Sequence, residues 1–485
     1  MPDDMTDTPS PTNIPEPRVF ETRHEGRFNG TAVSYRCVAG ETHVPDAKGQ
    51  PRASVFAFSY IAYHAGPPEG RAVVFAFNGG PGSASMWLHM GAMGPRRVVV
   101  PSDAASAGVA PYEVIDNPLC PLDVADIVFI DPPGTGYSRM VGAAKPEDGW
   151  GLEQDAEIVA GFIRTWLTAH RRWASPRYLC GESYGTTRAV AVAGKLGAGV
   201  GSMAFNGLGL ISVVLDFHTV RFEPGNPLPD VCALPTFAAT ALYHGLAAAG
   251  DEGEAGFIEG ARQFAVNAYL PALVAGSRLD EGKRAEVAAG LSRLTGLSVE
   301  WLMRARLRID PARYRREVLR SRGVSLGRFD TRYVGEDQDG VGEVPDNDPA
   351  SYSVSASYVS AMNDHLGRVL GVAWEGPYVN VNREVGQKWD WRGTAAEGGS
   401  RWPAAVNVAP VLGRAMRENP RLKVWMANGM YDLATPFFAA ETTAAGNGID
   451  AGRITMTYNP AGHMMYLHEP SLGALMADMR GWLAG

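Results

Sequence analysis

Short apolar runs that end in glycine-bearing loops recur along the chain. Most are continuous or nearly so, which is typical of strands buried on both faces of a parallel sheet. The strands predicted from them are Ala72–Phe77, Ile127–Ile130, Tyr178–Cys180, Leu208–Leu215, Leu422–Met426 and Ile454–Tyr458. Apolar residues at helical spacing, or runs of good helix formers, predict helices at Glu153–Trp173, Thr186–Leu196 and Leu472–Leu483. This alternation predicts an α/β fold with a mostly parallel central sheet flanked by helices.

Two segments depart from the alternation. From Arg18 to Tyr63, β-branched and aromatic residues predict strands at an antiparallel edge of the sheet. From Asp216 to about Glu375 the pattern is one of helices and loops. Helices are expected at Thr236–Ala249, Phe257–Ala275 and Ser298–Arg306, and from Asp310, a capping residue followed by proline. The basic stretch Arg304–Arg322 is expected to be a solvated helical surface.

These patterns divide the chain into four predicted parts. Residues 1–17 are expected to be a disordered tail, because they are rich in Pro, Asp and Thr. Residues 18–215 and 376–485 are expected to form the two halves of the α/β core, and residues 216–375 a helical cap insertion between them.

Composition narrows the class of protein. The 485 residues, 45% of them hydrophobic, are enough for a large core, and the net charge of −8 argues against binding to nucleic acids or anionic membranes. No apolar run approaches the length of a membrane span. The four cysteines are far apart and form no Cys-x-x-Cys pair, so neither a zinc site nor a disulfide framework is expected. The first 17 residues lack the features of a secretory signal, which favours a cytoplasmic location; the oligomeric state is not predictable.

One turn carries candidate chemistry. Ser183 lies in the sequence Gly-Glu-Ser-Tyr-Gly, after a predicted strand and before a predicted helix. A Gly-x-Ser-x-Gly turn in this context is the nucleophile elbow of α/β-hydrolases, which lifts the serine hydroxyl above the sheet. The same pattern occurs around Ser325, but there it follows a basic helical stretch and no strand. We therefore expect Ser325 to lie in a loop after a helix that Gly323 caps.

Asp432 and His463 also follow predicted strands. In open α/β sheets the carboxyl ends of the strands meet at the ligand site, so these residues could meet Ser183 there. The order Ser, Asp, His is the order of α/β-hydrolase triads, in which histidine takes the serine proton and the carboxylate orients the histidine. Each residue has a plainer interpretation: Ser183 as a small turn residue, Asp432 as the cap of a helix beginning near Thr435, and His463 as a structural histidine.

Five segments together resemble the serine carboxypeptidase family. They are Asn78-Gly-Gly-Pro-Gly82, Asp131–Ser138, Gly181-Glu-Ser-Tyr-Gly185, Gly429-Met-Tyr-Asp432 and Ala461-Gly-His-Met464. The resemblance implies hydrolysis of peptides from the C-terminus through an acyl-enzyme. It implies that Ser183 is the nucleophile, His463 the general base and acid, and Asp432 its orienting partner. It further implies an oxyanion hole of the Gly80 and Tyr184 N–H groups, and binding of the substrate carboxylate by Asn78 and Glu182, without metal or cofactor.

Two departures from the family pattern matter. Ser83 replaces the cysteine that usually follows the Asn-Gly-Gly-Pro-Gly motif, which fits the absence of a disulfide. The family's second carboxylate-binding acid falls, by counting, at Ala92. Part of the expected exopeptidase clamp is therefore missing, and an esterase or acyltransferase on the same fold is an alternative. A third hypothesis is a catalytically idle binding protein, against which the complete triad argues.

Overall fold

The computed structural model describes residues 14–64, 66–67, 70–199, 201–392 and 406–484. Residues 1–13 of the predicted disordered tail lie outside the described residues.

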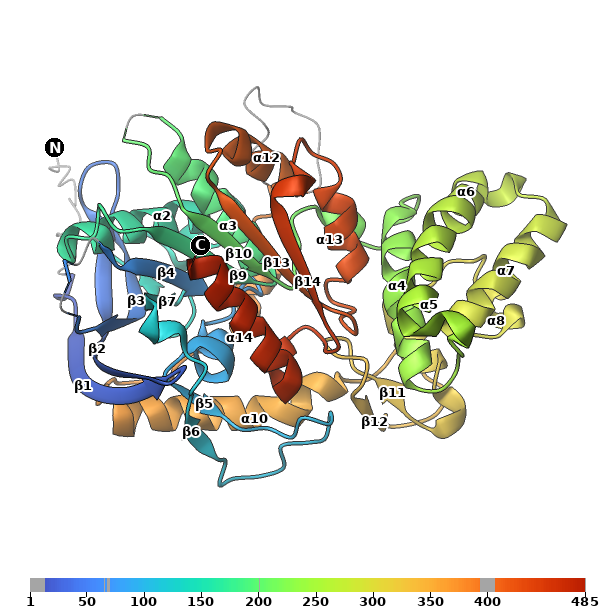
Figure 1. Cartoon of the computed structure of the whole chain (residues 1–485), viewed down its shortest axis with the longest axis horizontal. Helices are drawn as coiled ribbons and strands as arrows, with labels where there is room; N and C mark the ends of the chain where they lie inside the picture. Colours follow the sequence, from blue (N-terminus) through green and yellow to red (C-terminus); the bar gives the residue numbers. More distant parts are fainter. Residues whose placement is uncertain (1–13, 65, 68–69, 200, 393–405, 485) are drawn as a thin grey trace, which may run out of the picture.

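A ten-stranded sheet forms the centre of the molecule (Figure 1). Its main path has the order β1-β2-β3-β7-β4-β9-β10-β13-β14, and β8 pairs with β3. The strands are β1 (Val19–Phe28), β2 (Thr31–Pro45), β3 (Pro51–Ala62), β4 (Ala72–Phe77), β7 (Ala125–Ile130), β8 (Arg139–Met140), β9 (Arg177–Glu182), β10 (Gly207–Ile211), β13 (Lys423–Gly429) and β14 (Ile454–Asn459).

The direction of the strands agrees with the hydrophobic pattern. The strands from β7 to β14 along the path are parallel, whereas β1, β2 and β3 pair antiparallel at one edge. The parallel strands β4, β7, β9 and β10 are buried almost throughout, since helices cover both faces. The predicted parallel sheet with an antiparallel edge is confirmed.

Helices pack on both faces of the sheet and enclose two apolar cores. One core includes residues of α2 (Leu152–Ala169), α3 (Tyr184–Gly197) and α12 (Ala409–Glu418). The other includes residues of α1 (Met86–Leu88), the π-helical turn η2 (His89–Met93), α10 (Pro349–Asp364) and α14 (Glu469–Ala484). Helix α13 (Phe437–Ala444) follows β13, and α11 (Arg383–Lys388) lies in the chain between α10 and α12. No helix of the described ranges is long and apolar enough to cross a bilayer.

Most of the helices of the predicted cap insertion gather at one side of the sheet, beyond β14 (Figure 1). They are α4 (Leu228–Tyr243), α5 (Gly253–Phe264), α6 (Leu270–Ala275), α7 (Glu281–Thr295), α8 (Val299–Arg304) and α9 (Pro311–Glu317). Their apolar side chains form a core of their own, and α4 contacts α13 of the α/β part. Asp310 accepts the N–H groups of Ala312 and Arg313, as expected of the cap of α9.

Helix α10 differs from the other helices of this segment. It lies along the α/β part (Figure 1), and its Val354, Tyr358 and Met362 belong to a core of the sheet. The proposed boundaries of the insertion stay a prediction, but the helical segment clearly contributes to two different cores. The remaining short strands form two hairpin-like pairs, β5 (Arg96–Val98) with β6 (Val114–Asp116) and β11 (Ser325–Leu326) with β12 (Val334–Gly335).

Candidate active site

Ser183 lies on a sharp turn between β9 and α3. Its backbone has φ +62° and ψ −131°, a conformation that costs a non-glycine residue about 1–3 kcal/mol and is concentrated at functional sites. The flanking glycines permit the turn. A Cβ on Gly181 would lie 2.1 Å from the carbonyl oxygen of Gly185, and a Cβ on Gly185 would lie 2.8 Å from that of Phe77. The sequence around Ser183 therefore folds as the expected elbow.

Asp432 and His463 come together after β13 and β14. His463 Nδ1 lies 2.6 Å from Asp432 Oδ2, and the two residues are 4% and 0% exposed. Burial opposes the charge of Asp432, but the charge of His463 and the hydrogen bonds from His463 and Thr435 outweigh it and lower the pKa of Asp432. Burial likewise opposes the charge of His463, but Asp432 outweighs it and raises the pKa of His463. The carboxylate therefore stabilises the imidazolium, as a triad requires.

The other oxygen of Asp432 holds the loop that presents it. Oδ1 accepts the N–H groups of Ala434 at 2.7 Å and Thr435 at 3.0 Å. The next helix, α13, begins only at Phe437 after Pro436, so Asp432 is not its cap. The plainer interpretation of Asp432 as a helix cap is therefore wrong, and both carboxylate oxygens are fixed by the turn and the histidine.

The loop after β4 lies directly against the elbow. A Cβ on Gly79 would be 2.5 Å from the backbone nitrogen of Tyr184, so only glycine allows this approach. Gly80 and Tyr184 both line the same cavity as Ser183. Tyr184 is the first residue of α3, where N–H groups have no carbonyl partner within the helix. Gly80 and Tyr184, the residues expected to form an oxyanion hole, therefore both lie at the cavity that Ser183 lines.

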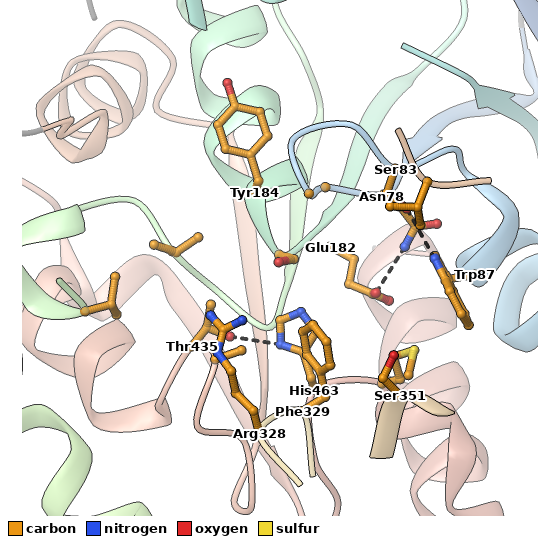
Figure 2. Close-up of a pocket in the computed structure, with 18 of the residues that line it drawn as sticks. Asn78, Ser83, Trp87, Glu182, Tyr184, Arg328, Phe329, Ser351, Thr435 and His463 are labelled. Carbon is orange, nitrogen blue, oxygen red and sulfur yellow. Dashed lines mark hydrogen bonds between the residues drawn. The ribbon is translucent and has the colours of Figure 1, made fainter. Parts of the chain in front are cut away.

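Asn78 and Glu182 form a buried pair beside the elbow. Asn78 Nδ2 donates to Glu182 Oε1 at 3.0 Å (Figure 2), while Asn78 Oδ1 accepts the N–H of Leu88 and so fixes the amide. Glu182 Oε2 is buried without a hydrogen-bond partner. Burial raises the pKa of Glu182 to about 7, although the charge of His463 and the hydrogen bonds from Tyr466 and Asn78 oppose the rise. A neutral Glu182 would have an O–H to donate toward a ligand.

The second acid of the clamp is absent from its expected place. Ala92 lies in η2, is fully buried and does not line the cavity. Tyr466 takes part instead: its hydroxyl donates to Glu182 Oε1 at 3.3 Å. A Cβ on Gly91 would lie 2.6 Å from the ring of Tyr466, so this ring packs against the backbone next to Ala92. Our sequence analysis missed Tyr466, whose only signal was its place three residues after His463.

Except for the buried Asp432, the expected site residues line one cavity of about 870 Å³, a volume suited to a segment of peptide. Its lining includes Asn78, Gly80, Glu182, Ser183, Tyr184 and His463. In the described part of the chain no hydrogen bond joins the Ser183 hydroxyl to His463, and such bonds are often long without substrate. No cluster of three metal-ligating side chains occurs among the described residues.

Residues of the predicted insertion 216–375 form part of the cavity wall. Phe217, Arg221, Phe329 and other residues between 216 and 375 line it, but within the described residues none belongs to α4–α9. These helices lie beside the sheet (Figure 1), and the cap role expected of the whole insertion stays a prediction. The connecting loops and α10 form this wall instead.

Ser325, the alternative serine, has a structural role. It is 1% exposed, and its hydroxyl donates to Asp337 and accepts from Arg316. Ser325 does not line the cavity that holds His463. Gly323 has the left-handed backbone of a C-cap, as expected.

Comparison with known proteins identifies one similar family. Residues 47–196, which include the glycine-rich loop and the elbow, match the family model of the serine carboxypeptidases. This segment of the chain is therefore similar to the serine carboxypeptidase family. The matched segment ends before Asp432 and His463, so the match does not include these two residues. No curated protein matches the chain.

A solved structure with a TM-score above 0.5 shares the fold. Kex1(delta)p, a prohormone-processing carboxypeptidase from Saccharomyces cerevisiae, is 14% identical, with a TM-score of 0.54 over 92% of this chain and 91% of its own. A proline iminopeptidase from Mycobacterium smegmatis is 13% identical, with a TM-score of 0.39 over 92% and 97%. A carboxyl esterase from Bacillus coagulans is 12% identical, with a TM-score of 0.36 over 91% and 98%. The match to Kex1(delta)p confirms the predicted α/β-hydrolase fold.

Proposed function

We propose that the protein is a serine-type carboxypeptidase, with Ser183, Asp432 and His463 as its catalytic triad. One observation carries the proposal: His463, hydrogen-bonded to the buried Asp432, lines the same cavity as a serine held at positive φ on a glycine-flanked turn. A buried carboxylate 2.6 Å from a histidine would stabilise the positive charge that the histidine must acquire during the reaction.

In the proposed reaction, Ser183 Oγ attacks the carbonyl carbon of the scissile bond while His463 Nε2 takes the hydroxyl proton. The N–H groups of Gly80 and Tyr184 bind the resulting oxyanion. His463 then gives the proton to the leaving amine, the C–N bond breaks, and the acyl group remains on Ser183. Water repeats the sequence: His463 takes its proton and the hydroxide attacks the ester carbonyl carbon. The bond between this carbon and Ser183 Oγ then breaks, His463 returns the proton to Oγ, and the shortened peptide leaves with a free carboxyl group.

Preference for the C-terminus would come from Asn78 and Glu182. The amide of Asn78 can donate to a carboxylate, and a protonated Glu182 can donate through its unpaired Oε2. An ionised Glu182 would instead repel the carboxylate. The raised pKa of Glu182 supports this role near neutral pH.

The experiment compares N-blocked dipeptides with free and amidated C-termini by measuring release of the C-terminal residue. We expect faster cleavage of the free acids, and loss of about 10⁶-fold in kcat for Ser183→Ala. Ser325→Ala is the matched control, because it makes the same change in the same short motif and should retain activity. Equal activity of Ser183→Ala and the parent would contradict the proposal.

An esterase or acyltransferase is the second candidate. The observation that favours it is Ala92 together with Tyr466, since an uncharged hydroxyl replaces an acid beside Glu182. If amidated peptides or simple esters are cleaved as fast as free acids, this candidate is preferred and the triad assignment stands. An idle binding protein would cleave none of them.

A further inference from the structure

The charges around the active-site cavity are unbalanced. Three arginines, Arg221, Arg328 and Arg383, line the cavity and are exposed at its rim. Glu182 is the one acidic residue in the described lining, and it is buried, with a pKa that burial raises to about 7. The chain as a whole carries a net charge of −8. A cationic rim on an acidic protein is therefore a local feature of this cavity.

The arginines are available to a ligand. Within the described residues, the guanidinium groups of Arg328 and Arg383 have neither an ion pair nor a hydrogen bond. Arg221 lies 3.3 Å from Glu223, but both side chains are more than half exposed, and such pairs contribute little. Buried Arg188, in contrast, is paired with Asp155 at 2.6 Å.

The three arginines reach the rim from separate parts of the chain. Arg221 follows the turn η5 (Phe217–Thr219), Arg328 lies between β11 and β12, and Arg383 is the first residue of α11. Three unrelated segments that each supply an unpaired or weakly paired cation to one cavity make a focused positive potential. Arginine is also the side chain best suited to bind a carboxylate through two parallel hydrogen bonds.

Arg328 lies close to the catalytic centre. Its guanidinium lies 5.5 Å from the ring centre of Phe329, and that ring lies 5.1 Å from the ring of His463. In Figure 2, Arg328 and Thr435 are on one side of His463, while Glu182, Asn78 and Trp87 are on the other. If Asn78 and Glu182 bind the C-terminal carboxylate on the leaving side, Arg328 flanks the acyl side.

We propose that Arg328, supported by Arg221 and Arg383, makes the cavity select acidic peptides, with a glutamate or aspartate on the acyl side of the scissile bond. This inference rests on the proposed function for the direction of the peptide. It adds a substrate class that the triad and the Asn78–Glu182 pair do not define.

Binding can be measured without catalysis. Ser183→Ala protein is titrated in a calorimeter with two acetylated peptides that differ only in Glu or Gln at the acyl-side residue. We expect the Glu peptide to bind about 5–30-fold more tightly than the Gln peptide. This is the gain in affinity expected from one to two charge-assisted hydrogen bonds at a partly exposed site. Adding Arg328→Gln should remove most of this difference, and the Gln peptide, which should bind as before, shows that the variant is folded.

The control is Arg368→Gln, which removes an equal charge from an exposed arginine that lies outside the cavity. It should leave the Glu-over-Gln preference unchanged, whereas high salt should weaken that preference, because rim charges are screened. Equal binding of the two peptides, or a preference that survives Arg328→Gln, would overturn the inference.

The same peptides separate this inference from the proposed function. If native protein cleaves Glu and Gln peptides equally well, the function stands and the inference fails. If Ser183→Ala protein prefers the Glu peptide but native protein cleaves neither, the proposed function fails and the acidic-peptide site stands.

Discussion

Replacing Glu182 by Gln tests the part of the site that recognises the substrate carboxylate. Glu182→Gln retains a hydrogen-bond donor of nearly the same shape but cannot ionise. In the native protein, Glu182 Oε1 accepts hydrogen bonds from the Asn78 amide and the Tyr466 hydroxyl, while Oε2 is buried without a hydrogen-bond partner. The variant can keep both hydrogen bonds through its oxygen and direct its amide toward the ligand.

The pKa of Glu182 sets the size of the effect. Burial raises that pKa to about 7. If only the neutral form binds a free-acid peptide, KM should double near pH 7 and be about tenfold higher at pH 8 than at pH 5, since each pH unit above the pKa lowers the neutral fraction tenfold. Glu182→Gln should show a nearly flat KM over this range, with kcat largely unchanged. An amidated substrate should show little of the rise in either protein.

Stability gives a second readout that needs no substrate. Between the ordinary pKa of 4.5 and the native value of about 7, the native state holds a proton that the unfolded state has released. The free energy of unfolding therefore falls as the pH rises through this window, by about 3 kcal/mol in total. Glu182→Gln should lack this contribution, so its stability relative to the parent should improve from pH 4.5 to pH 8.

The assay follows initial rates for one free-acid peptide from pH 5 to pH 8, together with denaturant unfolding at the two limits. Identical KM–pH curves for the parent and Glu182→Gln would refute the role of Glu182 in carboxylate recognition. The remaining interpretation would then be a structural carboxylate held by Asn78 and Tyr466.

Three further predictions follow from the same structure. Asp432→Asn should lower kcat by about 10⁴-fold, because an amide cannot hold His463 in the required tautomer, and a loss of less than tenfold in steady-state kinetics would argue against the triad. The kcat of the parent should fall as the pH is lowered, because protonated His463 cannot act as a base. Since the pKa of His463 is raised above 6.5, the midpoint of this fall should lie above pH 6.5; a midpoint below 6.5 in the pH–kcat profile would contradict this. Thiol titration of denatured, unreduced protein should find four free cysteines, because all four are unpaired and buried; fewer would indicate a disulfide. They are Cys37, Cys120, Cys180 and Cys232.

Much of the fold could be predicted because the parallel strands are continuous apolar runs in the sequence. A strand buried on both faces must be apolar throughout, and the predicted run Ala72–Phe77 is β4 without a change of boundary. The elbow could also be predicted from the sequence. Its turn requires glycine at positions 181 and 185, where a Cβ would collide with the backbone, and these glycines form the Gly-x-Ser-x-Gly motif. The meeting of Asp432 with His463 followed from strand order, since both come after parallel strands that end at one edge of the sheet.

The helical segment was harder to predict, because local patterns do not show what a helix packs against. The basic stretch was expected to be solvated, but Arg315 and Arg316 are buried and donate to carbonyl groups of the chain that follows, including those of Leu326 and Gly342. Tyr466 was missed for the same reason: nothing near it in the sequence shows that Glu182 is its partner. Long-range polar contacts of this kind become visible only in the folded chain.

The most direct test of the central claim is the identity of the reactive serine. Folded protein is treated with a fluorophosphonate, and the adduct is mapped by mass spectrometry after digestion. We predict labelling of Ser183, because it lies at the elbow in one cavity with His463, and no labelling of Ser325, which is buried and bonded to Asp337. Labelling at Ser325, or no labelling of active, folded protein, would contradict the account.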